Sequence, residues 1–289
     1  MKHFVIGLIL AGMAWLHASA QVTLDLRLAQ NEFLPGESIP LAVKITNLSG
    51  QKLHFGGEPG WLTFSVESTD GFDVVKNSEV PLPEEFDLFS SQAGTLHVDL
   101  APSFQISRTG HYKVTAVLHL KDWAASIPGT PKEFDIVNGV KLWSQNFGIP
   151  TSAGPPEMRE YSLEKANYLR EQLRLYLQLT DAAESRIFKT IALGPMVSFG
   201  FPEQQVDRVS QLHVLWQTGA QSFSYCVISP DGEILKRDLY ELINSRPKLN
   251  VDDNGEVSVV GGMKRIPATD IPPVHPPDEL PPLMPSPQK

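Results

Sequence analysis

The chain has 289 residues, with 24 Lys and Arg against 33 Asp and Glu, so its formal net charge is −9. Its 42% hydrophobic and 20% charged residues are typical of a folded globular protein and exclude a wholly disordered chain. The acidic balance excludes a nucleic-acid binder that works through a basic surface. A single cysteine excludes an intrachain disulfide and a multi-cysteine metal centre.

Residues 1–20 have the three parts of a secretory signal peptide. Lys2 supplies a positive charge, residues 4–16 are apolar, and Ala18-Ser19-Ala20 is a small-residue cleavage site. The alternative, an N-terminal membrane anchor, needs about 20 apolar residues, and this run is shorter. We therefore expect cleavage after Ala20, a secreted or periplasmic protein, and no integral membrane segment in the mature chain.

Residues 21–138 are expected to form a β-sandwich. Apolar and polar residues alternate along residues 22–28 and 39–45, and again along 112–120, as in strands with one buried face. Further strands are predicted at residues 61–67, 72–75, 96–100, 104–107 and 133–137. Short antiparallel strands separated by turn residues predict an all-β domain of two packed sheets.

Two short motifs carry a family resemblance. Pro35-Gly36-Glu37 precedes a strand that ends at Asn47, and Gly110 is followed by Tyr112 and Val114 in a G-x-Y-x-V pattern. These motifs resemble bacterial immunoglobulin-like and macroglobulin-type domains. The resemblance implies an immunoglobulin-like antiparallel sandwich that carries no chemistry of its own.

The next segments are expected to be a linker at residues 139–160 and a second domain, a β-meander, at residues 161–266. The linker prediction depends on the Pro- and Gly-rich composition of residues 150–156. Residues 161–171 fit either a short helical entry or irregular chain, before a strand from about 172 to 180. Later strands are marked by alternation and by turns at residues 229–232 and 252–255. This half resembles secreted bacterial β-rich proteins without an assigned activity.

The meander contains a candidate internal repeat. A shift of 45 residues superposes Pro202 on Pro247, Val206-Asp207 on Val251-Asp252, and Val214 on Val259. A period in the forties is the size of a propeller blade of four strands, but only about two blades of chain are present. Simple similarity between two hairpins is the alternative interpretation.

Residues 267–289 contain nine prolines. This composition predicts an extended, disordered tail without a core. A spacer or docking segment is the alternative to a plain terminus.

Few residues offer chemistry. Cys226 lies in a strand-like run, and a small buried residue is the favoured interpretation over a catalytic thiol. His111 and His119 are eight residues apart along one strand, so they are too distant for a shared metal. Residues 252–256 are acidic but lack calcium-loop spacing, which favours a hairpin turn.

An acidic loop and two tryptophans are the remaining candidates. Four carboxylates, Glu79, Glu84, Glu85 and Asp87, could serve a glycosidase only if two of them converge in space. Trp61 and Trp123 could stack on sugars, although packing in the core is the commoner role. No catalytic residue is therefore assigned, and neither a cofactor-binding nor a metal-ligating residue is predicted.

The favoured function is a non-enzymatic, secreted or periplasmic binding or scaffolding protein whose partner is another envelope or extracellular protein. One alternative is a glycan-acting enzyme with acidic residues in a cleft between the domains. A second is a protease-inhibitor or sensor domain that uses the loop at residues 80–83. The partner, the oligomeric state and the exposure of Cys226 do not follow from the sequence.

Overall fold

The computed structural model describes residues 21–83, 85–150, 155–168 and 172–265. The expected leader and proline-rich tail lie outside the described residues. The described chain is almost entirely β-structure, with one 3-10 turn at Lys121–Trp123, so the predicted all-β class is confirmed. Contacts divide it into two compact units, with the boundary between Ser198 and Phe199. No helix of the described residues is long and apolar enough to cross a membrane.

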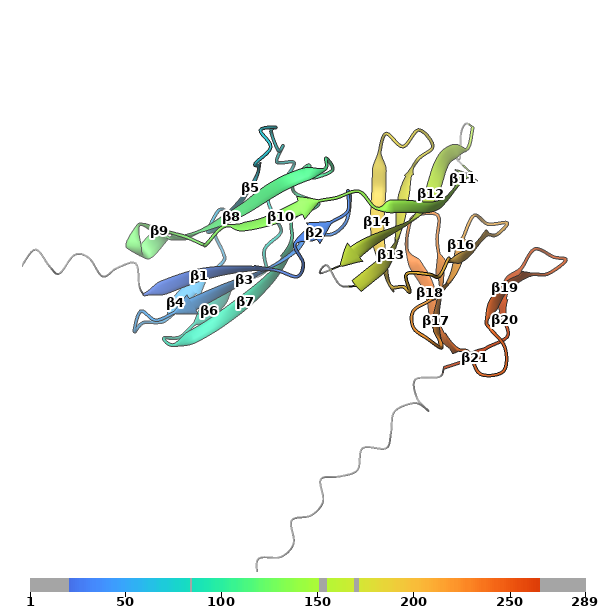
Figure 1. Ribbon diagram of the computed structural model, residues 1–289. Coiled ribbons are helices and arrows are strands. Elements are labelled where there is room, and N and C mark those ends of the chain that lie inside the picture. Colours follow the sequence, from blue (N-terminus) through green and yellow to red (C-terminus); the bar gives the residue numbers. More distant parts are fainter. Residues whose placement is uncertain (1–20, 84, 151–154, 169–171, 266–289) are drawn as a thin grey trace, which may run out of the picture. The chain divides into compact units, whose positions relative to one another are not determined.

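The first part of unit one is a sandwich of two sheets (Figure 1). One sheet has the order β1-β3-β7: β1 (Val22–Leu28), β3 (Pro40–Asn47) and β7 (Gln92–Asp99). The other has the order β2-β10-β8-β5, with β9 paired to β8: β2 (Glu32–Phe33), β5 (Leu62–Ser68), β8 (Gly110–Leu120), β9 (Ala125–Pro128) and β10 (Lys132–Ile136). A small two-stranded sheet pairs β4 (Leu53–Phe55) with β6 (Phe86–Leu88). All pairings are antiparallel except that of β2 with β10.

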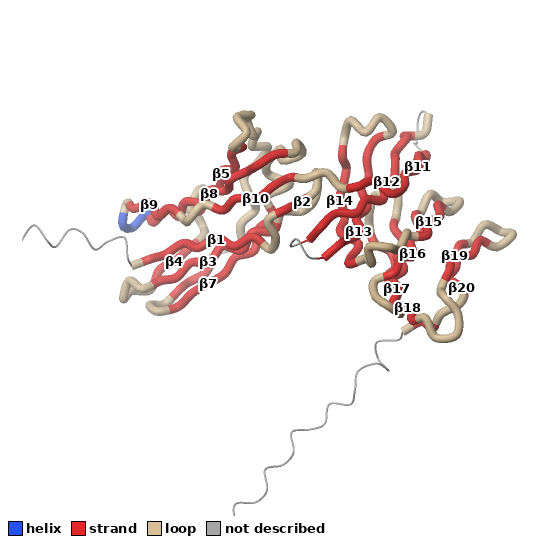
Figure 2. Tube along the Cα trace, viewed as in Figure 1, coloured by secondary structure: helices blue, strands red, loops and turns tan. Residues whose placement is uncertain are grey.

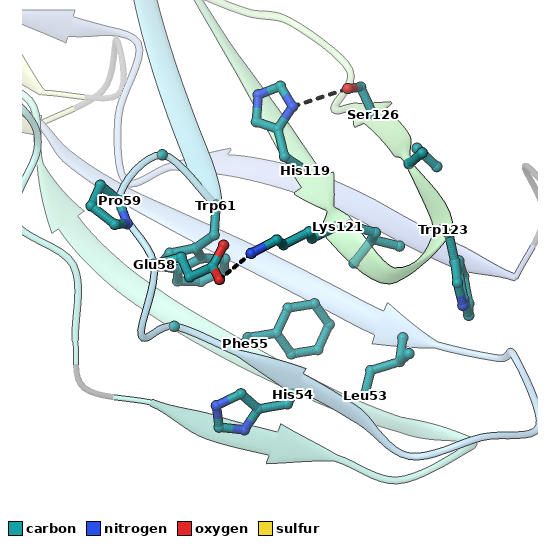
Figure 3. A pocket seen from close by; sticks show the side chains of 15 residues that line it. Leu53, His54, Phe55, Glu58, Pro59, Trp61, His119, Lys121, Trp123 and Ser126 are labelled. Atoms are coloured by element: carbon teal, nitrogen blue, oxygen red, sulfur yellow. Dashed lines mark hydrogen bonds and ion pairs between the residues drawn. The ribbon is translucent and has the colours of Figure 1, made fainter.

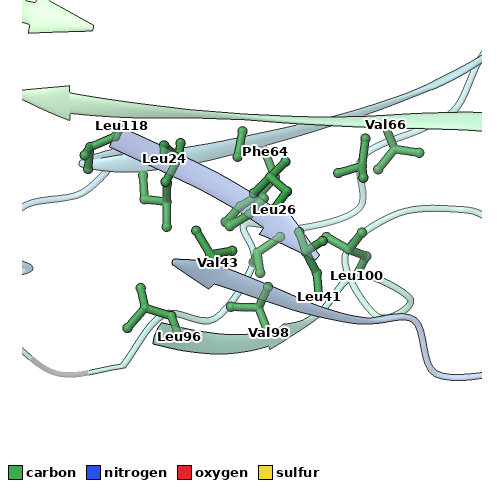
Figure 4. Close-up of a cluster of buried hydrophobic side chains, with 14 of the residues drawn as sticks. Leu24, Leu26, Leu41, Val43, Phe64, Val66, Leu96, Val98, Leu100 and Leu118 are labelled. Atoms are coloured by element: carbon green, nitrogen blue, oxygen red, sulfur yellow. The ribbon is translucent and has the colours of Figure 1, made fainter. Parts of the chain in front are cut away.

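The alternating residues face a single apolar core between these sheets. Leu41, Val43 and Ile45 of β3 are fully buried and belong to the same cluster as Val114 and Leu118 of β8. Figure 4 shows side chains from both sheets meeting in this layer. The predicted strands at residues 72–75 and 104–107 are wrong, because these segments meet only through one isolated bridge, Lys76 to Phe104.

The segment expected as a linker is instead part of a sheet. The sheet has the order β11-β12-β13-β14: β11 (Val140–Ile149), β12 (Glu157–Tyr168), β13 (Gln172–Asp181) and β14 (Ile187–Pro195). The turn-forming composition that predicted a linker belongs to the short connection between two paired strands, of which residues 151–154 lie outside the described part. The helical entry is also wrong, since residues 161–168 continue β12, whereas the strand predicted from about residue 172 is confirmed.

The Pro35-Gly36-Glu37 turn of the sandwich contacts one face of this sheet. The Thr190 hydroxyl donates to the Pro35 carbonyl at 2.7 Å, and the Thr190 amide donates to the Gly36 carbonyl at 3.2 Å. Gly36 has φ +76°, and a Cβ there would lie 2.6 Å from Cγ2 of Ile187. Glycine is therefore needed both for the turn and for the close approach of β14.

Unit two is a second antiparallel meander (Figure 2). Its main sheet has the order β15-β16-β17-β18-β21: β15 (Glu203–Val206), β16 (Leu212–Gln217), β17 (Ser222–Ile228), β18 (Ile234–Glu241) and β21 (Met263–Lys264). A separate hairpin pairs β19 (Lys248–Val251) with β20 (Val257–Val260). Its Leu249 and Val259 pack against the apolar cluster of the main sheet, which consists of Leu215, Phe223, Tyr225 and Val227.

The segments related by the shift of 45 residues are two hairpins of the same register. Glu203 pairs with Leu215, and Lys248 pairs with Val260. In both loops an aspartate caps the turn: Oδ1 of Asp207 accepts from the Gln211 amide, and Oδ1 of Asp252 accepts from the Glu256 amide. The hairpin turn predicted at residues 252–256 is thus confirmed, whereas a propeller-blade repeat stays a prediction.

Candidate functional site

The sandwich contains a pocket of about 460 Å³ (Figure 3). Its walls come from three pieces of chain: strand β4, the loop of residues 56–60 that follows it, and the turn that joins β8 to β9. This volume lies within the range of ligand-binding clefts, about 300–1,000 Å³. The pocket is therefore a site of the right size for one or two rings of a small ligand.

Aromatic rings make up much of the pocket surface. The Phe55 and Trp61 ring centroids are 5.9 Å apart, and Phe86 lies behind both, 5.3 Å from Phe55 and 6.0 Å from Trp61. In Figure 3, Trp61 and Trp123 lie on either side of Phe55 and Leu53. Both tryptophans are half-buried and packed against the sandwich core, so their positions are fixed while part of each ring stays accessible.

Polar side chains surround this aromatic surface. Oε1 of Glu58 and Nζ of Lys121 form an ion pair at 2.5 Å that joins the loop after β4 to the turn after β8. Nδ1 of His119 lies 2.9 Å from the Ser126 hydroxyl. The Glu58 and Lys121 side chains are 59% and 77% exposed, so both reach the solvent at the rim of the pocket.

His54 adds a titratable group to the same rim. Its Nδ1 lies 2.9 Å from Oδ1 of Asp87, and Nε2 lies 3.5 Å from Oε2 of Glu85. The hydrogen bond with Asp87 raises the pKa of His54 above its usual value. In turn, hydrogen bonds from Lys52 and then His54 lower the pKa of Asp87.

Glycine gives the loop after β4 its shape. Gly56 and Gly57 have φ of +98° and +72°, in the left-handed region that favours glycine. A Cβ on Gly56 would lie 2.7 Å from the Cα of Glu85. The loop therefore closes against Glu85, the residue before β6, and this brings Glu58 and Trp61 to the pocket.

The two tryptophans singled out in the sequence are brought together here, with His119 from the strand that also holds His111. His111 is elsewhere, with Nδ1 2.6 Å from Asp135, so the two histidines do not share a site, as predicted. Sequence reasoning missed Phe55, Lys121 and Glu58. The Gly-Gly-Glu-Pro-Gly run at residues 56–60 was the signal that could have located them, because its glycines mark a sharply folded loop.

In the described part of the acidic loop, Glu85 and Asp87 both contact the His54 ring, one at each nitrogen. Glu79 pairs with Lys76 at 2.6 Å, Glu85 lies beside His54, and Asp87 pairs with Lys52 at 2.8 Å. Glu84 lies outside the described residues. The neighbouring loop at residues 80–83 is not a free segment, because Val80 is buried and Leu82 packs on the sandwich core.

Cys226 is fully buried, as favoured from the sequence, and burial raises the pKa of its thiol to about 11. On the neighbouring strand β16, His213 is buried. Its Nδ1 lies 2.7 Å from the Tyr225 hydroxyl, and its Nε2 lies 3.3 Å from Oδ2 of Asp207. Asp207 also caps its own loop, so this network anchors the β15–β16 hairpin to the sheet. Among the described residues, no group of three or more His, Cys, Asp or Glu could hold a metal ion.

Comparison with known proteins adds no family to this description: no protein-family model matches the chain, and no curated protein matches it.

Proposed function

We propose that this chain is an exported, non-enzymatic binding protein whose sandwich pocket binds a saccharide. The observation that carries the proposal is the pair Trp61 and Trp123 beside Phe55, ringed by Glu58, Lys121 and further polar groups. A pyranose ring has an apolar C–H face, which packs on aromatic rings, and hydroxyl edges, which need donors and acceptors. The pocket offers both kinds of surface within about 460 Å³.

Binding fits the lining better than hydrolysis. Glycosidases use two carboxyl groups about 5–9.5 Å apart on either side of the scissile bond. Among the described residues that line the pocket, the carboxylate is that of Glu58, and its partner is an ammonium group, not a second acid. The predicted signal peptide supports export, and the resemblance to immunoglobulin-like domains supports a binding role.

The test is isothermal titration of the purified chain with cellohexaose, chitohexaose and maltohexaose. We expect one of these to bind in the micromolar to low-millimolar range. Trp123→Ala should weaken that binding at least ten-fold, since the variant removes one stacking surface. Phe89→Ala is the matched control, because Phe89 is a 55% exposed aromatic residue of the same sandwich outside the pocket lining.

Circular dichroism and thermal melting accompany both variants, because Trp123 also packs against the core. Should none of the three hexasaccharides bind at millimolar concentration, the saccharide proposal is wrong. Equal weakening by the two variants would also contradict it, since the pocket would then not be the binding site.

A further inference from the structure

Strand β11 is the outermost strand of the β11–β14 sheet. From Trp143 to Ile149 it pairs regularly with β12, and these seven residues include neither a charged residue nor a proline. Exposed sheet edges in native proteins are ordinarily blunted by charges, prolines, bulges or short length. Here the bulge lies before Trp143 and the only charge of the strand is Lys141, so neither of these devices protects the segment from Ser144 to Asn146.

The direction of the backbone groups follows from the neighbouring strands. The Ala182 amide donates to the Met158 carbonyl at 3.2 Å, so even-numbered residues of β12 direct their backbone groups toward β13. Odd-numbered residues of β12 then direct theirs toward β11. The register pairs these with Trp143, Gln145 and Phe147, so the N–H and C=O groups of Ser144 and Asn146 face away from the sheet.

This outward edge is accessible. The side chains of Ser144, Gln145 and Asn146 are exposed, and within the described part of the chain β12 is the one strand that pairs with β11. Phe147 is held in place by stacking on Tyr161, with ring centroids 4.1 Å apart. The edge is therefore already regular and extended in the single chain.

We propose that β11 pairs with β11 of a second copy of this chain, antiparallel and centred on Gln145. This register places Ser144 of each copy opposite Asn146 of the other, and both residues present outward N–H and C=O groups. It also places Trp143 of each copy opposite Phe147 of the other, so this pair occurs twice. Aromatic pairs across strands stabilise antiparallel sheets.

A second copy suits this edge because the arrangement is two-fold symmetric. Antiparallel pairing of identical strands is self-complementary and closed: each β11 edge is used once, giving a dimer and not a fibre. The net charge of −9 opposes self-association in general, but the paired segment itself contains no carboxylate. The result is a continuous antiparallel sheet built from both copies of β11–β14.

The first test is sedimentation velocity of the purified chain over a range of concentrations. We expect a monomer–dimer equilibrium. Gln145→Lys should raise the dimer dissociation constant at least ten-fold, because two like charges then face each other at the centre of the interface. Gln51→Lys is the matched control, the same change at an exposed turn of the sandwich.

The second test fixes the register. Opposed residues of a pair without mutual hydrogen bonds have their Cβ atoms about 4.5–5.5 Å apart, close enough for a disulfide after small adjustment. Gln145→Cys should therefore form a covalent dimer under mild oxidation, whereas Gln51→Cys should stay monomeric on a non-reducing gel. Cys226 is buried and should not interfere.

A chain that remains monomeric at all concentrations would overturn the proposal. So would a dimer that survives Gln145→Lys unchanged, since its interface would lie elsewhere. A dimer that is sensitive to lysine but does not cross-link through Gln145→Cys would overturn the register.

Discussion

The sandwich and the β11–β14 sheet of unit one bury their strands in different ways. In the sandwich, β3 buries Leu41, Val43 and Ile45 while the residues between them reach the surface, at least in part. In β12, the five consecutive residues from Glu160 to Glu164 are all buried. One face of the β11–β14 sheet is apolar, with Tyr161 and Leu177. The opposite face is mixed: it carries Ser162, Gln178 and Thr190 beside a small apolar cluster of Ala166, Tyr176 and Leu34 of the sandwich.

Polar side chains on the second face of the β11–β14 sheet are buried where they find hydrogen-bond partners. On β12 to β14 the even-numbered residues share that face, and Gln178 and Thr190 both donate to the Pro35 carbonyl of the sandwich turn. By contrast, the hydroxyls of Ser162 and Thr180 are buried with no hydrogen-bond partner among the described residues. The sandwich core therefore depends on packing, whereas this face depends both on a small apolar cluster and on which polar groups are paired.

The largest effect is expected in the sandwich core. Leu41→Ala removes a fully buried side chain from the central strand of a sheet, and such truncations lower the free energy of unfolding by about 2–5 kcal/mol. Urea denaturation would measure the loss. A change below about 1 kcal/mol would contradict the view that apolar packing is the main contribution to the stability of the sandwich.

The next effect compares two threonines on the mixed face. Thr190→Val removes the 2.7 Å hydrogen bond to the Pro35 carbonyl, which keeps its second donor, Gln178, and should lower the free energy of unfolding by about 0.5–1.5 kcal/mol. Thr180→Val replaces a hydroxyl that has no partner, so stability should stay unchanged or rise by about 1 kcal/mol. The same denaturation experiment checks both, and equal losses in the two variants would contradict the comparison.

The smallest expected effect is a pH dependence of the free energy of unfolding, which comes from Glu37 in the turn of the sandwich that contacts the β11–β14 sheet. Burial raises the pKa of Glu37 above 4.5, against the lowering effect of hydrogen bonds from the Leu34 amide and Gln30. The folded state then binds this proton more tightly than the unfolded state, so the contribution is present below pH 4.5 and is lost as pH rises through the folded pKa.

Glu37→Gln removes this titration. The stability of the variant relative to the original chain should therefore increase as pH rises from 4.5 toward neutrality. Thermal melting of both proteins across that range measures the difference. A stability difference that is constant with pH would show that Glu37 titrates normally in the folded state.

The same comparison explains which parts of the fold could be predicted. Alternation along β1, β3 and β8 is visible in the sequence because only one face is buried, and these strands were predicted within a few residues. In β12, burial of both faces removes the alternation, and Leu163, Ala166 and Leu169 fit a helical period by chance. Pairing with β11 and β13 decides the outcome, and such long-range pairing is not written in local sequence.

The candidate site was predictable only in pieces. Trp61 and Trp123 were identified as possible stacking residues from their type alone. Their meeting depends on the pairing of β5 and β9 with opposite sides of β8, which joins residues about 60 positions apart. Lys121 and Glu58 could not be assigned, because an exposed ion pair between two loops leaves no periodic signal.

The most direct test of saccharide binding uses the tryptophans themselves. Two-dimensional NMR of the ¹⁵N-labelled chain resolves the indole N–H signals, which are assigned through Trp→Phe variants. Titration with the hexasaccharide that binds should shift the signals of Trp61 and Trp123 together. The signal of Trp216, which is 1% exposed in unit two, should stay in place and serves as the internal control. If Trp61 and Trp123 do not move at saturating ligand, the pocket does not bind saccharide and the proposed function is wrong.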